Sequence, residues 1–163
     1  STLSSSSAAS DVYKRQKLTG EQLIPAPVET VWQMINDPEV LRACIPGCES
    51  LERGEDDRLT ATVALKVGPV KARFAGEVTL SEIDPPNGYR IFGKGSGGVA
   101  GFAEGGAVIA LAPVEGGTLL SYEAEAKIGG KLAQLGTRLI DSTAKKLTLQ
   151  FFDALNQRIT ETA

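Results

Sequence analysis

The stretch from Lys131 to Ile159 has the most regular spacing of apolar positions in the chain. Apolar or small residues recur there at intervals of three or four, which places them on one face of an α-helix. At about 1.5 Å per residue, this predicted helix is roughly 43 Å long. Such a helix needs a broad surface to cover its apolar face, and strands predicted upstream supply one. The stripe consists of Leu132, Leu135, Leu139, Thr143, Leu147, Phe151, Leu155 and Ile159, with Gly136 and Ile140 on the same side.

The two halves of this predicted helix differ in side-chain size. The segment 129–144 is rich in Gly, Ala, Ser and Thr, whereas 147–159 is rich in Leu and Phe. The second half is therefore suited to filling a core. The first half would leave room if it faced the concave side of a sheet, but small residues also allow close contact between helix and sheet. The pattern leaves both interpretations open.

Two short helices are predicted near the N-terminus, after a strand candidate at Lys17–Ile24. The first should begin at Pro27, because apolar residues then follow at helical spacing as far as Ile35. The second has Asp37 as its expected N-cap and Pro38 as its first residue. These short elements precede a long region of different periodicity.

From Cys48 to Ile128 the period drops to two, which predicts six β-strands with one wet face each. Short turns rich in Gly and Pro join them, so the strands should form an antiparallel meander covered on one face by the terminal helix. The fold class is therefore α+β. The clearest strands are Leu59–Val67, Ala72–Leu80, Tyr89–Gly95, Ala107–Val114 and Leu120–Ile128.

Composition adds several limits to this picture. The 163 residues suffice for one domain, predicted at 17–160, and the net charge of −3 argues against nucleic-acid binding. A membrane-spanning helix would need a run of about 18 apolar residues, and the sequence contains no such run. The first 16 residues are mostly Ser and Ala, and we interpret them as a disordered or non-native leader.

Candidate catalytic chemistry is sparse. The chain has no His, which excludes Ser-His and Cys-His nucleophiles, and its acidic residues fall mostly on the predicted wet faces. Cys44 and Cys48 supply only two of the four ligands of a structural zinc, so we predict reduced thiols and no metal site. Tyr122 is the one notable polar group on the predicted inner face. It would either donate a hydrogen bond to a ligand or be satisfied within the core.

A Gly-rich passage from Gly93 to Gly106 contains seven glycines. Gly93–Gly98 formally matches the dinucleotide pattern G-x-G-x-x-G, and 88–95 falls one residue short of a phosphate-binding loop. Both motifs require a helix to begin at once, whereas more strand follows here. A flexible hairpin or a bulged sheet edge is the better interpretation.

Five segments form a recognisable set: Pro27–Trp32, Asn36–Leu41, Cys44–Glu49, Val67–Gly76 and Gly129–Gly136. In these segments the sequence resembles the CoxG family, which is named after an accessory subunit of carbon monoxide dehydrogenase. The resemblance extends over nearly all of 17–159.

This resemblance implies the START-like helix-grip fold of the SRPBCC superfamily. In that fold a curved antiparallel sheet, here of about seven strands, wraps a long C-terminal helix and encloses an apolar cavity. Family members are similar to accessory factors of molybdenum CO dehydrogenases or related hydroxylases, in membrane recruitment and in binding the quinone acceptor. Some carry a C-terminal anchor. This sequence stops four residues after the predicted helix, which favours a soluble or transient carrier.

The leading expectation is therefore a non-enzymatic, cytoplasmic adaptor or carrier that binds a quinone or another lipid and contacts the inner membrane face transiently. No covalent cofactor is expected. The alternatives are a cyclase- or dehydratase-like enzyme using the same cavity, or a docking protein with a filled core. Residues Gly97, Gly98, Val99 and Phe102 are expected at the cavity rim as a mobile gate. The expected lining is Phe74, Val78, Tyr122, Leu132, Leu135, Gly136 and Ile140.

Overall fold

The computed structural model describes residues 13–162, and the side chains of 15–160 within that range. The order of elements agrees with the prediction: a strand, two short helices, six strands and a long helix. The helices are α2 (Val28–Ile35), α3 (Pro38–Cys44), α4 (Thr137–Thr162) and the 3₁₀ turns η1 (Gly98–Ala100) and η2 (Gly130–Leu135). The strands are β1 (Tyr13–Ile24), β2 (Cys48–Arg53), β3 (Arg58–Val67), β4 (Val70–Asp84), β5 (Gly88–Ser96), β6 (Phe102–Val114) and β7 (Gly117–Gly129).

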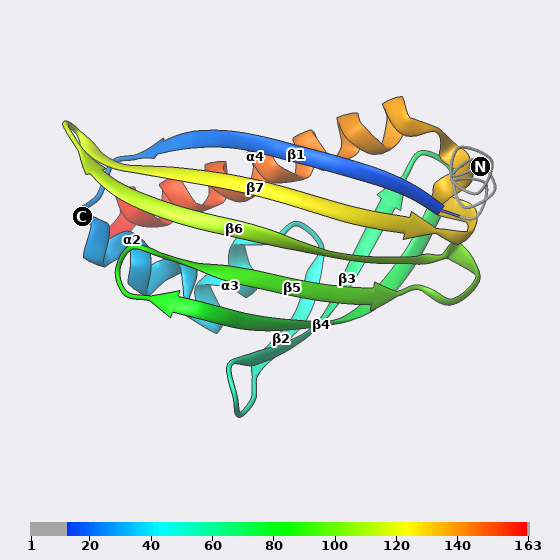
Figure 1. Cartoon of the computed structure of the whole chain (residues 1–163), viewed down its shortest axis with the longest axis horizontal. Helices are drawn as coiled ribbons and strands as arrows, with labels where there is room; N and C mark the ends of the chain where they lie inside the picture. The colour runs from blue at the N-terminus through cyan, green and yellow to red at the C-terminus, as the bar shows by residue number, and fades with distance from the viewer. Residues whose placement is uncertain (1–12, 163) are drawn as a thin grey trace, which may run out of the picture.

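The seven strands form one antiparallel sheet in the order β1-β7-β6-β5-β4-β3-β2. Strands β2 to β7 are a meander, and β1 joins its far side by pairing with β7. Figure 1 looks onto one face of this curved sheet, with α4 running diagonally behind it from the end at η2 to the end at α2. The expected α+β helix-grip architecture is therefore present.

Register divides the strand residues between two faces. Val78, Ile109 and Tyr122 pack against the core formed with α4, so they define the inner face. The core cluster lies mainly where α2 and α3 meet the C-terminal half of α4, which burial of apolar area stabilises. It consists of Ile24, Ala26, Val31, Ile35, Val40, Cys44, Leu80, Tyr89, Leu111, Leu120, Phe152, Leu155 and Ile159.

The caps of the two short helices follow from local chemistry. The side chain of Asp37 accepts a hydrogen bond from the backbone N–H of Glu39 at 2.9 Å, as its predicted N-cap role requires. Pro27 is the N-cap of α2 rather than its first residue. The hydroxyl of Thr118, which is fully buried, donates to the carbonyl of Ala26 at 2.8 Å and ties β7 to the start of α2.

The long helix and the first strand do not begin where the sequence predicts. The long helix does not begin at Lys131, because η2 occupies Gly130–Leu135 and α4 starts only at Thr137. Between them Gly136 has φ +91° and ψ 149°, which a helix does not contain. The first strand begins at Tyr13 instead of Lys17, while residues 1–12 of the predicted leader lie outside the described part.

Another difference from the prediction concerns the extent of the Gly-rich passage. Most of it is paired strand, because β5 runs to Ser96 and β6 resumes at Phe102. Only 97–101 leave the ladder, and there the N–H of Gly97 donates to the carbonyl of Gly101 at 2.9 Å. Neither phosphate-binding motif is followed by an α-helix, so the structure agrees with a hairpin at this position.

Candidate functional site

Small residues gather on the inner face of the central strands. Pairing places Gly76 beside Gly95, Gly93 beside Gly105, and Ala107 beside Ala124, all with inner-face parity. Large apolar side chains are therefore sparse in this band, which lies beyond the core cluster toward η1. The whole band comprises Ala61, Gly76, Gly93, Gly95, Ala103, Gly105, Ala107, Ala124 and Ala126.

The N-terminal half of α4 lies over this end of the sheet without burying it fully. The backbone of α4 lies closest to α3 and to β1 and β3, near the two sides of the sheet. Inner-face residues Phe74, Val78 and Ile91 are only half-buried although they point toward the helix. Small residues could either allow close contact between helix and sheet or leave space between them. The half-buried side chains support the second interpretation.

Tyr122 lies at the border between the core and the small-residue band. Its ring stacks on Phe152 of α4 with centroids 5.9 Å apart, and it lies against Gly20 of β1. A Cβ at Gly20 would overlap the tyrosine ring, so a larger residue there would displace Tyr122 from this position. Within the described part of the chain the hydroxyl of Tyr122 makes no hydrogen bond. It is therefore a donor available to a bound molecule.

Tyr89 is the contrasting case on the same face. It is 7% exposed, packs against Trp32 with ring centroids 5.4 Å apart, and donates its hydroxyl hydrogen to the carbonyl of Ile35 at 3.2 Å. Burial raises the pKa of Tyr89 to about 12, and the positive charge of Arg53 opposes that rise. Tyr89 is thus a buried tyrosine with its hydrogen bond satisfied within the core. The sequence left this role open for Tyr122.

The predicted lining residues occupy several layers of the inner side. Val78 and Tyr122 pack against the core cluster, while Leu132 and Ile140 are buried at the other end of the molecule. Leu135 is half-buried in η2, and Gly136 stands at the break before α4 instead of on a helical stripe. No atom would lie within 4 Å of a Cβ added at Gly136. The lining as a set stays a prediction.

The predicted rim residues lie at and beside η1. Val99 at the tip is 84% exposed and Phe102 is 41% exposed. A Cβ at Gly97 would lie 2.6 Å from Cε1 of Phe74, so the rim begins directly beside one predicted lining residue. The sequence did not indicate that Gly101 and Gly130 touch each other, which joins η1 to η2.

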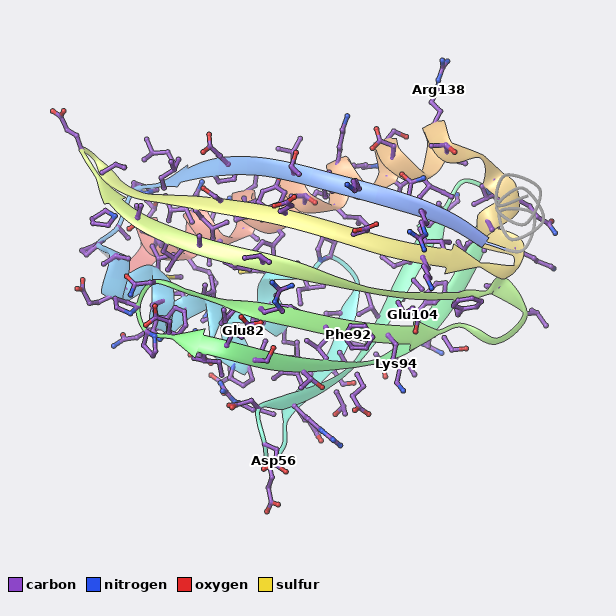
Figure 2. The ribbon with its side chains drawn as sticks, viewed as in Figure 1. Asp56, Glu82, Phe92, Lys94, Glu104 and Arg138 are labelled. Carbon is purple, nitrogen blue, oxygen red and sulfur yellow. The ribbon has the colours of Figure 1, made fainter. Side chains whose placement is uncertain are left out.

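Two open hollows lie on the outer face of the sheet. One has a volume of about 690 Å³ and is bordered by Thr60, Glu77, Lys94 and Phe102, among others. The second, of about 560 Å³, is bordered by Phe92, Glu104 and residues of β7. Figure 2 shows Phe92, Lys94 and Glu104 close together on this face. None of the seven predicted lining residues borders either hollow.

The two cysteines lie apart from this band. Cys44 is buried in the core and Cys48 is half-buried, and both are free thiols. Desolvation raises the pKa of each thiol, while Arg158 opposes the effect at Cys44. Within residues 13–162, no three His, Cys, Asp or Glu side chains are grouped as a metal site would need. Nor does any helix of this part have the length and apolarity to cross a membrane.

The curved seven-stranded sheet around a long C-terminal helix, with an open donor on the inner face, defines a START-like, SRPBCC-type protein. The sequence model of the CoxG subunit of carbon monoxide dehydrogenase matches residues 20–160, which is most of the chain. The chain therefore belongs to the CoxG family, whose members are accessory subunits associated with carbon monoxide dehydrogenase.

Solved structures share this fold. A conserved protein from Geobacillus kaustophilus is 32% identical with a TM-score of 0.85, over 90% of this chain and 97% of that one. A putative uncharacterized protein from Rhizobium leguminosarum (19% identity, TM-score 0.67, 89% and 94% coverage) shares the fold. So does protein Ms6760 from Mycobacterium smegmatis (18% identity, TM-score 0.67, 90% and 92% coverage). Among curated proteins no match is found.

Proposed function

We propose that this protein is a non-enzymatic carrier that binds a quinone between the sheet and the N-terminal half of α4. It would deliver the quinone to a molybdenum CO dehydrogenase or a related hydroxylase from the cytoplasmic side of the membrane. Family membership supports the association with the dehydrogenase. The observation that carries the ligand is the hydroxyl of Tyr122, which lies over Gly20 of β1 on the inner face, at the border of the small-residue band, without an acceptor among the described residues.

The chemistry of the band fits a quinone. A quinone head is flat and apolar apart from two carbonyl oxygens, each of which accepts hydrogen bonds but donates none. Half-buried apolar side chains beside glycines and alanines offer it surface, and one donor fixes one carbonyl. Tyr122 already stacks on Phe152, so the aromatic surface there is preformed.

The two alternatives are less well supported by the same observations. An enzyme would need a second ionisable group beside Tyr122. The inner-face residues paired with it are Gly20 and Ile109, and the next inner-face residues along β7 are Leu120 and Ala124, none of which is ionisable. A docking protein with a filled core would bury its inner face throughout, yet Phe74 and Val78 stay half-buried.

Titration of the protein with a short-chain quinone, with binding measured by calorimetry, tests this proposal. Replacing Tyr122 by Phe removes one hydrogen bond to a ligand and should weaken binding about 2- to 10-fold, with little change in thermal stability. Tyr89→Phe is the matched control, because it leaves the carbonyl of Ile35 unbonded. It should lower stability while leaving quinone affinity unchanged. An unchanged affinity in Tyr122→Phe, or no quinone binding by the unaltered protein, would contradict the proposal.

A further inference from the structure

Three segments that are far apart in sequence meet at one end of the molecule. They are the β3–β4 turn (66–71), the η1 segment (97–103) and the η2 segment (129–138), which we call together the basic tip. A Cβ at Gly68 would lie 2.7 Å from Cδ2 of Leu139, so the β3–β4 turn touches the start of α4. Gly101 meets the carbonyl of Gly129 and the backbone of Gly130. Figure 1 shows η1 and η2 at the same end.

The basic tip has a charge opposite to that of the chain. Its segments contain Lys66, Lys71, Lys131 and Arg138 but no Asp or Glu. The tip therefore has a formal charge of +4, whereas the net charge of the whole chain is −3. The rest of the chain therefore carries −7. All four cations are exposed, and Figure 2 shows Arg138 pointing away from the body.

Within the described residues none of these four cations forms an ion pair. By contrast, several arginines elsewhere are held by carboxylates: Arg53 by Asp57, Arg73 by Glu49 and Arg90 by Glu82. The positive charges of the tip are consequently not neutralised inside the protein. They are available to an external anionic surface.

The basic tip also carries exposed apolar side chains on its η1 segment. Val99 at the apex of η1 is 84% exposed, and Phe102 is 41% exposed beside Gly129. An exposed apolar apex on the same end of the molecule as unpaired cations is an arrangement that anionic bilayers attract. The cations stay at the headgroups while the apolar side chains enter the boundary with the acyl chains.

We infer that the basic tip docks on anionic phospholipid headgroups. This inference deepens the proposed function and rests on it in one respect: docking sets the η1 rim of the proposed quinone site against the membrane that holds the quinone. An acidic protein surface is the competing partner. Three of the four cations are lysines, which act as point charges without the planar fork that pairs with fixed carboxylates. They suit the diffuse charge of lipid headgroups.

Co-sedimentation with phosphatidylcholine vesicles, with and without phosphatidylglycerol, tests the inference. The full chain should bind only the anionic vesicles, and added salt should weaken binding. The double variant Lys131→Gln/Arg138→Gln should bind about 25-fold more weakly, at roughly fivefold per charge. The control Arg42→Gln/Lys146→Gln removes as many exposed charges outside the tip and should retain binding.

A second pair of variants tests the apolar contribution. Val99→Ser should weaken vesicle binding without changing the melting temperature, whereas Val114→Ser, at an exposed position at the far end of β6, should leave binding intact. Absence of binding to anionic vesicles, equal binding to neutral ones, or equal losses in tip and control variants would overturn the inference. The inference would also be overturned if the unaltered protein did not bind vesicles and the tip variants no longer bound the dehydrogenase.

Quinone titration of variants with the tip cations replaced, such as Lys131→Gln/Arg138→Gln, separates the two proposals. They should bind short-chain quinone in solution like the unaltered protein, because the tip cations lie outside the small-residue band. Quinone binding without vesicle binding would overturn the docking surface alone. Vesicle binding without quinone binding would overturn the proposed function alone.

Discussion

Two inner-face tyrosines show how the surroundings of one residue type decide its role. The hydroxyl of Tyr89 is buried and bonded to Ile35, whereas the hydroxyl of Tyr122 has no protein acceptor within the described residues. The first contributes to stability and the second is available to a ligand. Their sequence contexts are both alternating strand, so periodicity alone did not separate these two roles.

Tyr89 should make stability depend on alkaline pH. Its pKa is about 12 when folded and 10.0 ordinarily, so between these values the unfolded state binds fewer protons than the folded state. The free energy of unfolding should therefore fall as pH rises from 10 to 12, by about 2 to 3 kcal/mol in the limit. Urea melts measure this effect. The difference in free energy of unfolding between the unaltered protein and Tyr89→Phe should become smaller as the pH rises across this range. A constant difference would contradict the assignment.

The two cysteines should behave as protected thiols. Burial raises the pKa of both, which lowers the thiolate fraction at neutral pH and slows their reaction with a disulfide reagent. We expect a thiol reagent to detect two thiols per chain after unfolding in denaturant. In the folded protein, Cys44 should react slowly. One zinc per chain by elemental analysis would contradict this expectation.

At the scale of elements, the break at Gly136 separates η2 from α4. Its φ of +91° with ψ of 149° lies in a region open almost only to glycine. Gly136→Ala should therefore lower the free energy of unfolding by about 1 to 3 kcal/mol, although no atom would touch the new Cβ. Gly54→Ala is the control, since Gly54 lacks a positive φ and has open surroundings. A thermal melt showing Gly136→Ala as stable as the control would contradict this account.

The η1 segment should exchange its amide hydrogens faster than the strands beside it. Only 97–101 lie outside the ladder, and Val99 at the apex is almost fully exposed. Hydrogen exchange should show rapid labelling there and protection across the β4 strand around Phe74. Equal protection in both would exclude the mobile gate.

At the scale of the whole molecule, a filled core and an open band coexist along α4. Filling the band should remove the ligand and not the fold: Ala107→Leu on the inner face should abolish quinone binding with a small change in melting temperature. Ala110→Leu, exposed on the outer face of the same strand, is the control. If the inner face is in fact fully packed, Ala107→Leu should instead cost about 1 to 3 kcal/mol of stability through overpacking.

Much of the fold was predictable because its signals are local. Period-two alternation from Cys48 to Ile128, the Asp37 cap and the short turns rich in Gly and Pro each depend on neighbouring residues, and the structure confirms them. The start of α4 was not predictable in this way. Leu132 and Leu135 continue the apolar spacing, and spacing does not reveal that Gly136 adopts a positive φ.

The sequence by itself determined the element order, the inner and outer parity of the strands and the resemblance to the CoxG family. Only the tertiary structure decided which residues meet: Tyr122 with Gly20, η1 with η2, and the β3–β4 turn at Gly68 with Leu139 near the start of α4. The physical reason is that side-chain periodicity follows from the backbone geometry of each element. Proximity across the sheet depends on strand order, register and curvature, which involve the whole chain at once.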